Sequence, residues 1–87
     1  MICIPIAAAT TDAAILRMEH AALLADLVEL RIDRIPGVDM KRLLTARRTP
    51  VIVTNRSRQE GGGFTGTEEE RVERLKEAVC LGADYVD

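Results

Sequence analysis

Apolar runs of strand length alternate along this chain with segments of helical periodicity. Strand-like runs begin near residues 2, 26, 50 and 84, and amphipathic segments lie between them. This alternation predicts a parallel sheet, because two parallel strands must be joined by a crossover that is usually helical. A (β/α)8 barrel of about 250 residues uses roughly 30 residues for each βα unit. The 87 residues therefore hold about three βα units and the start of a fourth strand.

Capping residues and hydrophobic periodicity locate the expected helices. Residues 11–24 have apolar positions at helical spacing, and Asp39 can cap a second, short helix. Thr67 followed by Glu70 is a capping box, which predicts the start of a third helix. The expected buried stripe of that third helix consists of Val72, Leu75 and Val79.

Two charged residues interrupt the second expected strand. Side chains alternate between the faces of a strand, so Glu29 and Arg31 share one face, with Val28, Leu30 and Ile32 on the other. Strands of parallel sheets are usually covered on both faces and apolar throughout. A buried charge without a partner is costly, as shown by the loss of about 3–5 kcal/mol when a buried ion pair is broken. Charges are therefore rare on such strands unless they are paired. The pattern favours a polar site on this face, and a structural ion pair is the alternative.

The order of elements is compatible with either a barrel or an open doubly wound sheet. The charges on the second strand favour the barrel. The turn Ala7–Thr10 after the first strand lacks the G-x-G-x-x-G pattern of dinucleotide-binding sheets. We therefore expect an α/β fold in which residues 1–87 form a single partial domain, the N-terminal part of a (β/α)8 TIM barrel. Because such a part exposes open edges at its first and fourth strands, we expect it to belong to a longer protein.

Composition excludes several classes of partner. The net charge of −2 implies no general attraction to nucleic acid or to an anionic membrane. Phe64 and Tyr85 are the only aromatic residues, too few for the stacking platforms that bind single-stranded nucleic acid. The apolar segment Met1–Ala9 is too short to span a membrane and lacks the basic leader of a secretory signal.

The cysteine content indicates neither a disulfide framework nor a metal centre. Cys3 and Cys80, with the single His20, cannot supply the usual four zinc ligands. Both cysteines have apolar neighbours, so we expect buried, reduced thiols. That expectation fits a cytoplasmic protein without a metal.

A second arginine follows the third expected strand. Thr54 and Arg56 share a face, and Arg56 lies just past the carboxyl end of the strand, where parallel α/β folds bind ligands. Arg31 and Arg56 would hold equivalent places on neighbouring strands and would repel each other unless anions lie between them. Glu29 and Glu60 are possible partners, and an oxygen-rich substrate is another, because guanidinium groups suit carboxylates and clustered oxygens. The alternative for Arg56 and Glu60 is a solvated loop position.

The segment 57–66 after the third strand is longer than the usual two to six residues of a βα loop. Its three consecutive glycines predict mobility, and Phe64 could close over a site as a lid. A phosphate cradle is the rival interpretation. It is disfavoured because the G-K-[ST] ending of a P-loop is missing.

Several short motifs, in this order and spacing, resemble type I 3-dehydroquinate dehydratase over the whole chain. They are Cys3-Ile4-Pro5-Ile6, Glu29-Leu30-Arg31, Thr54-Asn55-Arg56, Glu60-Gly61-Gly62 and Gly82-Ala83-Asp84-Tyr85-Val86-Asp87. The resemblance implies a (β/α)8 barrel, a lyase that dehydrates 3-dehydroquinate to 3-dehydroshikimate in the shikimate pathway of aromatic amino acid biosynthesis. It also implies a Schiff-base lysine, a proton-transferring histidine, and no metal or organic cofactor.

By the same resemblance, Glu29, Arg31 and Arg56 would bind and orient the substrate oxygens, and Glu60 would support the same site. Asn55 departs from the family, which often has an aromatic residue there. We expect Asn55 to point away from Arg56, so the departure puts little in doubt.

No catalytic residue is assigned within these 87 residues. The family's lysine and histidine fall beyond Asp87. Lys41 and Lys76 lie on expected helices and are solvated, whereas an imine-forming lysine needs a desolvated or charge-perturbed setting. His20 falls on the outer ring of a barrel, away from the strand ends where active sites lie. We therefore expect the segment alone to be inactive.

Two other functions are compatible with the sequence. The segment could bind an oxyacid through Arg31 and Arg56 without chemistry, or it could be a structural half barrel that forms a homodimer to cover its edges. In the favoured interpretation the partner is the small-molecule substrate, and neither nucleic acid nor membrane is involved.

Overall fold

One parallel sheet organises the chain. The computed structural model describes residues 1–87. The strands are Cys3–Ile6 (β1), Leu27–Arg31 (β2), Val51–Thr54 (β3) and Tyr85–Val86 (β4). The α-helices are Thr11–Ala21 (α1), Met40–Thr45 (α2) and Glu68–Cys80 (α3), and two 3-10 turns span Ile32–Arg34 (η1) and Arg58–Glu60 (η2).

The four strands lie side by side in sequence order, β1-β2-β3-β4, and every neighbouring pair is parallel. In the register, Glu29 lies between Pro5 of β1 and Ile52 of β3, and Arg31 lies beside Thr54. A sheet without a reversal of strand order is the arrangement of a barrel, whereas a doubly wound sheet reverses its order at a switch point.

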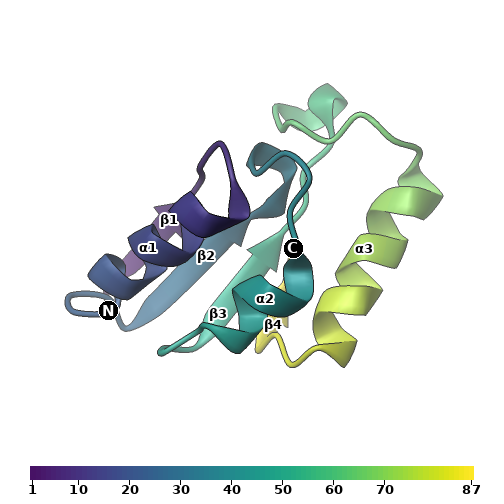
Figure 1. The fold of residues 1–87 in the computed structure, drawn as a ribbon. Coiled ribbons are helices and arrows are strands. Elements are labelled where there is room, and N and C mark those ends of the chain that lie inside the picture. Colours follow the sequence, from purple (N-terminus) through teal and green to yellow (C-terminus); the bar gives the residue numbers. More distant parts are fainter.

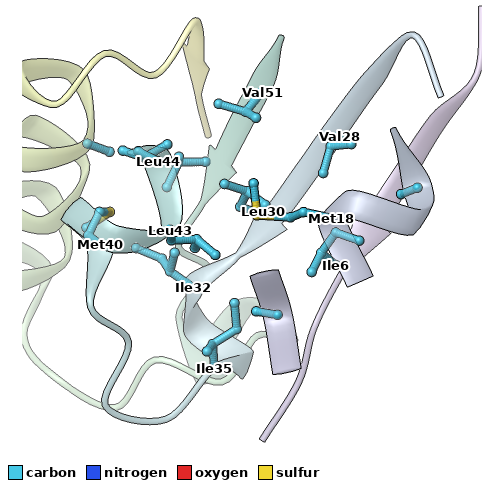
Figure 2. Close-up of a cluster of buried hydrophobic side chains, with 14 residues drawn as sticks. Ile6, Met18, Val28, Leu30, Ile32, Ile35, Met40, Leu43, Leu44 and Val51 are labelled. Atoms are coloured by element: carbon cyan, nitrogen blue, oxygen red, sulfur yellow. The ribbon is translucent and has the colours of Figure 1, made fainter. Parts of the chain in front are cut away.

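The hydrophobic core lies on one face of this sheet. Figure 2 shows its side chains between the strands and the helices. The strand residues of this cluster, all on the same face by register, are Ile6, Val28, Leu30, Val51 and Val53. The helices contribute Ala14, Met18, Ala21, Met40, Leu43, Leu44 and Ala78. In Figure 1, α1 and α2 lie across the sheet while α3 flanks β3 and β4. Helices on a single face are expected of a barrel wall, which confirms the predicted fold class.

No helix covers the opposite face. By register, this open face carries Pro5, Glu29 and Ile52 at one level and Arg31 with Thr54 at the next. Tyr85, at the same level as Ile52, is 61% exposed. This is the face that points inward when a barrel closes, so the charges of β2 belong to the barrel interior.

The predicted helix starts are confirmed. The Asp39 side chain accepts a hydrogen bond of 3.1 Å from the Arg42 amide at the start of α2. At α3, Thr67 and Glu70 form the reciprocal capping box, with bonds of 2.8 and 3.1 Å. The first helix ends at Ala21, earlier than the expected Leu24. None of the helices is long and apolar enough to cross a membrane.

Equivalent aspartates precede β2 and β4. Each follows an alanine. Each accepts a hydrogen bond from a backbone amide at or just before the start of the neighbouring strand, β1 for Asp26 and β3 for Asp84. Asp26 binds the Ile2 amide at 2.8 Å, and Asp84 binds the Val51 amide at 2.9 Å. Asp84 also pairs with Arg47 at 2.8 Å. These carboxylates satisfy donors at the amino ends of the strands, opposite to the end where ligands bind.

Two expectations about burial were wrong. Both thiols are exposed, because Cys3 lies on the open face of the edge strand β1 and Cys80 lies in the last turn of α3. In α3, Ala78 is the buried residue, and Val79 is 55% exposed. The expected stripe of Val72, Leu75 and Val79 was therefore partly wrong, because the face of α3 that meets the sheet runs through Leu75 and Ala78.

Candidate functional site

Glu29 is held by a hydroxyl on the neighbouring strand. Thr54 Oγ1 donates a 2.7 Å hydrogen bond to Glu29 Oε2, and Thr54 is fully buried. The contact follows from the register, because both residues share the open face and Thr54 lies two residues past Ile52, the partner of Glu29 on β3. No ion pair joins Glu29 to Arg31, so the alternative of a structural Glu29–Arg31 pair is wrong. One carboxylate oxygen of Glu29 has no hydrogen-bond donor within the protein.

Arg31 is paired with Asp33, an aspartate two residues further along the chain. Nε and one Nη of Arg31 donate to the two Asp33 oxygens at 3.1 and 2.7 Å. The Asp33 side chain has no exposed surface, and its second oxygen also accepts the Gly63 amide at 3.0 Å. Burial by itself raises the pKa of Asp33. The hydrogen bonds from Arg31 and Gly63 outweigh that effect and hold the pKa below its usual value.

Arg56 lies beyond the end of β3 and has a different partner from the expected one. Its guanidinium contacts Asp87 at 3.0 Å, and the two side chains are 42% and 63% exposed. Of the possible partners, neither Glu29 nor Glu60 pairs with an arginine; Asp33 and Asp87 do. The places of the arginines also differ, because Arg31 lies level with Thr54, the last residue of β3, and Arg56 lies two residues beyond it. Repulsion between the guanidinium groups is relieved by two separate aspartates.

Glu60 lies apart from the other three predicted site residues. It ends η2, is exposed, and makes no hydrogen bond or ion pair with Glu29, Arg31 or Arg56. With the neighbouring loop and the start of α3, it lines a hollow of about 360 Å³. The structure thus brings Glu29 and Arg31 together at the open end of β2 and places Glu60 on the adjoining loop.

The loop after β3 is closed by backbone hydrogen bonds. The Gly62 amide donates to the Ser57 carbonyl at 2.7 Å, and the Phe64 amide donates to the Arg56 carbonyl at 3.0 Å. A Cβ on Gly62 would lie 2.0 Å from the Arg56 carbonyl oxygen, and Gly61 has a φ of +86°. We expected the glycines to provide mobility; the structure assigns them close backbone contacts and a left-handed turn.

Asn55 points away from the open face, as expected. It is buried, and its side-chain amide donates to the Arg71 carbonyl at 3.3 Å. Arg71 in turn donates to the Asn55 carbonyl at 3.0 Å and forms a bidentate pair with Glu68. Arg71 therefore joins α3 to the end of β3.

Sequence reasoning missed Asp33 and Asp87 as partners of the two arginines. A weak signal was present for Asp33: an acidic residue follows Arg31 at a spacing of two, directly after the strand. For Arg56 the only signal was the acidic end of the fourth expected strand, which the register brings beside β3. The Arg56–Asp87 contact joins segments far apart in sequence, and Asp33 is held partly by Gly63, 30 residues away; periodicity encodes neither contact.

The open end of β2 and β3 can recognise a ligand with several oxygens. Arg31 and Arg56 offer guanidinium N–H donors, and Glu29 offers a carboxylate acceptor. This set suits carboxylates and hydroxyl groups. The two lysines are remote from it, because Lys41 and Lys76 are exposed on α2 and α3.

Comparisons with known proteins agree with this geometry. The family model for type I 3-dehydroquinase matches residues 2–87. The bifunctional 3-dehydroquinate dehydratase/shikimate dehydrogenase of Arabidopsis thaliana, a chloroplastic protein, is 38% identical over 92 residues. The 3-dehydroquinate dehydratase of Methanococcus maripaludis strain S2 is 37% identical over 87 residues. Both matches cover 100% of the chain.

A solved structure shows the same fold. The crystal structure of 3-dehydroquinate dehydratase from Geobacillus kaustophilus HTA426 superposes with a TM-score of 0.76 at 32% identity, over 99% of this chain. The chain spans 38% of that enzyme, 40% of the Methanococcus protein and 15% of the Arabidopsis protein. The four strands thus correspond to one part of a TIM barrel. The match over residues 2–87 places this chain in the type I 3-dehydroquinase family.

Proposed function

We propose that this chain is the N-terminal part of a (β/α)8 enzyme that dehydrates 3-dehydroquinate to 3-dehydroshikimate in the shikimate pathway. In this proposal the segment supplies substrate-binding residues. The observation that carries it is the cluster at the open end of β2 and β3, in a chain that matches the family over residues 2–87. Glu29 and Arg31 lie on the face that becomes the barrel interior, and Arg56 lies at the strand end where barrel enzymes bind ligands.

The chemistry of the substrate fits the residues. 3-Dehydroquinate carries a carboxylate, a ketone and hydroxyl groups. Arg31 and Arg56 suit its anionic and oxygen-rich parts, and the free oxygen of Glu29 can accept a hydroxyl hydrogen bond. Glu60 lies on the loop that borders this end of the sheet and would support the site from there.

The bond-making groups belong to the remainder of the barrel. In the proposed mechanism a lysine outside these residues forms a Schiff base with the ketone, and a histidine outside them moves protons. Lys41 and Lys76 are exposed on the outer helices and do not have the desolvated setting that an imine-forming lysine needs. The proposal also includes a cytoplasmic enzyme that works without a metal and can form a homodimer.

A chimeric barrel tests the proposal. Residues 1–87 would replace the aligned 38% of the Geobacillus kaustophilus enzyme, which supplies the other strands. We expect this chimera to fold and to convert 3-dehydroquinate, measured by absorbance of the enone product. An unfolded chimera, or a folded one without turnover, would contradict the proposal. Binding of the substrate by a folded but inactive chimera would favour the oxyacid-binding alternative.

A matched pair of variants tests the role of Arg56. In the chimera, Arg56→Ala removes a guanidinium from the proposed site, and Arg48→Ala removes one from an exposed position before β3. Loss of a charged hydrogen bond is worth about 1.5–3 kcal/mol, so kcat/KM should fall roughly 10- to 100-fold in Arg56→Ala. Arg48→Ala should retain the parental value. Equal values for the two variants would exclude Arg56 from the site.

A further inference from the structure

Asp33 connects two parts of the structure through a side chain that has no exposed surface. Its carboxylate accepts two hydrogen bonds from the Arg31 guanidinium and a third from the Gly63 amide. A buried carboxylate is costly unless its oxygens are satisfied, and here three donors from two segments satisfy them. A purely local ion pair between neighbours in sequence would not need the Gly63 amide.

The pairing fixes the direction of the Arg31 guanidinium. An arginine has five N–H donors in a planar fork, and Asp33 uses Nε–H and one Nη–H. The remaining donors lie on the other edges of the same plane, on a side chain that belongs to the open face and is 18% exposed. Because the bond is bidentate, the plane cannot rotate without losing both contacts.

The same aspartate holds the loop that carries Glu60. A Cβ on Gly63 would lie 2.3 Å from the Asp33 carbonyl oxygen, so the loop backbone packs directly against η1. A second contact reinforces this packing, because Arg34 donates to the Gly61 carbonyl at 3.0 Å. The turn after β2 and the loop after β3 therefore move as one unit if Asp33 keeps its bonds.

We propose that Asp33 is a positioning residue that orients Arg31 toward the substrate, with the Gly63 amide holding the Asp33 carboxylate in place. This role rests on the proposed function, and Asp33 itself does not touch the substrate. It predicts that Asp33 acts on substrate affinity through Arg31, and that removing Arg31 abolishes the effect.

Kinetics of the chimera test this dependence. Asp33→Asn keeps the size of the side chain but replaces one acceptor oxygen by an NH2 group, so the fork cannot be held by two oxygens. We expect KM for 3-dehydroquinate to rise about tenfold with kcat changed less than threefold, the pattern of lost binding that is equal in ground and transition states. Asp12→Asn is the matched control, because it breaks an exposed aspartate–arginine pair between α1 and Arg42.

A double-mutant cycle separates positioning from general destabilisation. In an Arg31→Ala background, Asp33→Asn should leave KM unchanged, because residues that act through one another are not additive. Additive effects on KM, an unchanged KM in Asp33→Asn alone, or an equal rise in Asp12→Asn would overturn the proposal.

The isolated chain supplies a readout that is independent of turnover. In ¹⁵N NMR spectra of residues 1–87, the Arg31 Nε–H signal and the Gly63 amide signal should be protected from solvent exchange. Both protections should be lost in Asp33→Asn and kept in Asp12→Asn. If the chimera is inactive while these signals behave as described, the proposed function fails and the positioning geometry stands. If the Arg31 signal is unprotected in the parent chain, the positioning proposal fails whatever the activity.

Discussion

Replacing Gly62 by alanine should break the closure of the loop after β3. The added Cβ would lie 2.0 Å from the carbonyl oxygen of Arg56 and 2.4 Å from its carbonyl carbon. Both atoms belong to the backbone, so no side-chain rotation can relieve the clash. The loop must therefore move away from the end of β3.

The cost can be worked out from the hydrogen bonds that this movement breaks. Three backbone bonds close the loop at the site of the clash: Gly62 to Ser57 at 2.7 Å, Phe64 to Arg56 at 3.0 Å, and Arg58 to Phe64 at 3.0 Å. A typical bond contributes about 0.5–1.5 kcal/mol net, so their loss should lower the free energy of unfolding by roughly 1.5–4.5 kcal/mol. This is a large part of the stability of a small domain.

Gly61→Ala is the matched control. No atom lies within 4 Å of a Cβ at Gly61, so its cost is the strain of a left-handed residue, about 1–2 kcal/mol. Urea unfolding followed by circular dichroism measures both costs, and amide hydrogen exchange reports the loop directly. The Phe64 amide should lose protection in Gly62→Ala and keep it in Gly61→Ala. A Gly62→Ala protein with parental stability and a protected Phe64 amide would refute this reasoning.

Three further predictions concern other contacts. Thr54→Val removes the hydroxyl group that donates a hydrogen bond to Glu29 but keeps the shape of the side chain. The free energy of unfolding in urea should fall by about 1.5 kcal/mol, the lower end for a bond to a charged group, because Glu29 is only half-buried. An unchanged urea midpoint would show that the bond contributes nothing. Asp84→Ala leaves the Val51 amide without its partner and should cost about 1–3 kcal/mol, seen as a lower Tm, whereas an unaltered Tm would contradict the capping role. The pKa of Asp33 is lowered in the folded state. The ionised Asp33 therefore stabilises the fold above its unfolded pKa of about 3.9, and this stabilisation is lost as pH falls through the folded pKa. The stability gap between the parent and Asp33→Asn should therefore shrink in acid, and a gap that stays constant down to pH about 2 would contradict this linkage.

Relations between residues close in sequence were sufficient to predict the strands and the helix starts. The capping box at Thr67 and the Asp39 cap depend on residues three apart, and both were predicted. The shared face of Glu29 and Arg31 follows from the two-residue period of a strand. The barrel-type sheet followed from the spacing of the strands and from charges that only an interior site explains. Each of these inferences uses contacts that are short in sequence or set by regular geometry.

The contacts that hold the candidate site were beyond such rules. Asp33 meets Gly63 across 30 residues, and Arg56 meets Asp87 across 31. These pairings depend on where an irregular loop and a neighbouring strand end lie in space. The glycines show the same limit, because glycine permits mobility and close backbone approach equally, and only the position of the Arg56 carbonyl decides between them. Arg31 and Arg56 were singled out correctly as arginines near strand ends, but their partners were not.

Borohydride trapping tests most directly the claim that this segment binds substrate and leaves the covalent chemistry to the rest of the barrel. The isolated chain and the Geobacillus chimera would each be treated with 3-dehydroquinate and borohydride, then mapped by peptide mass spectrometry. We expect a reduced adduct on a lysine of the Geobacillus-derived part of the chimera, and none on Lys41 or Lys76 in either protein. An adduct on Lys41 or Lys76 of the isolated chain would contradict this division of labour.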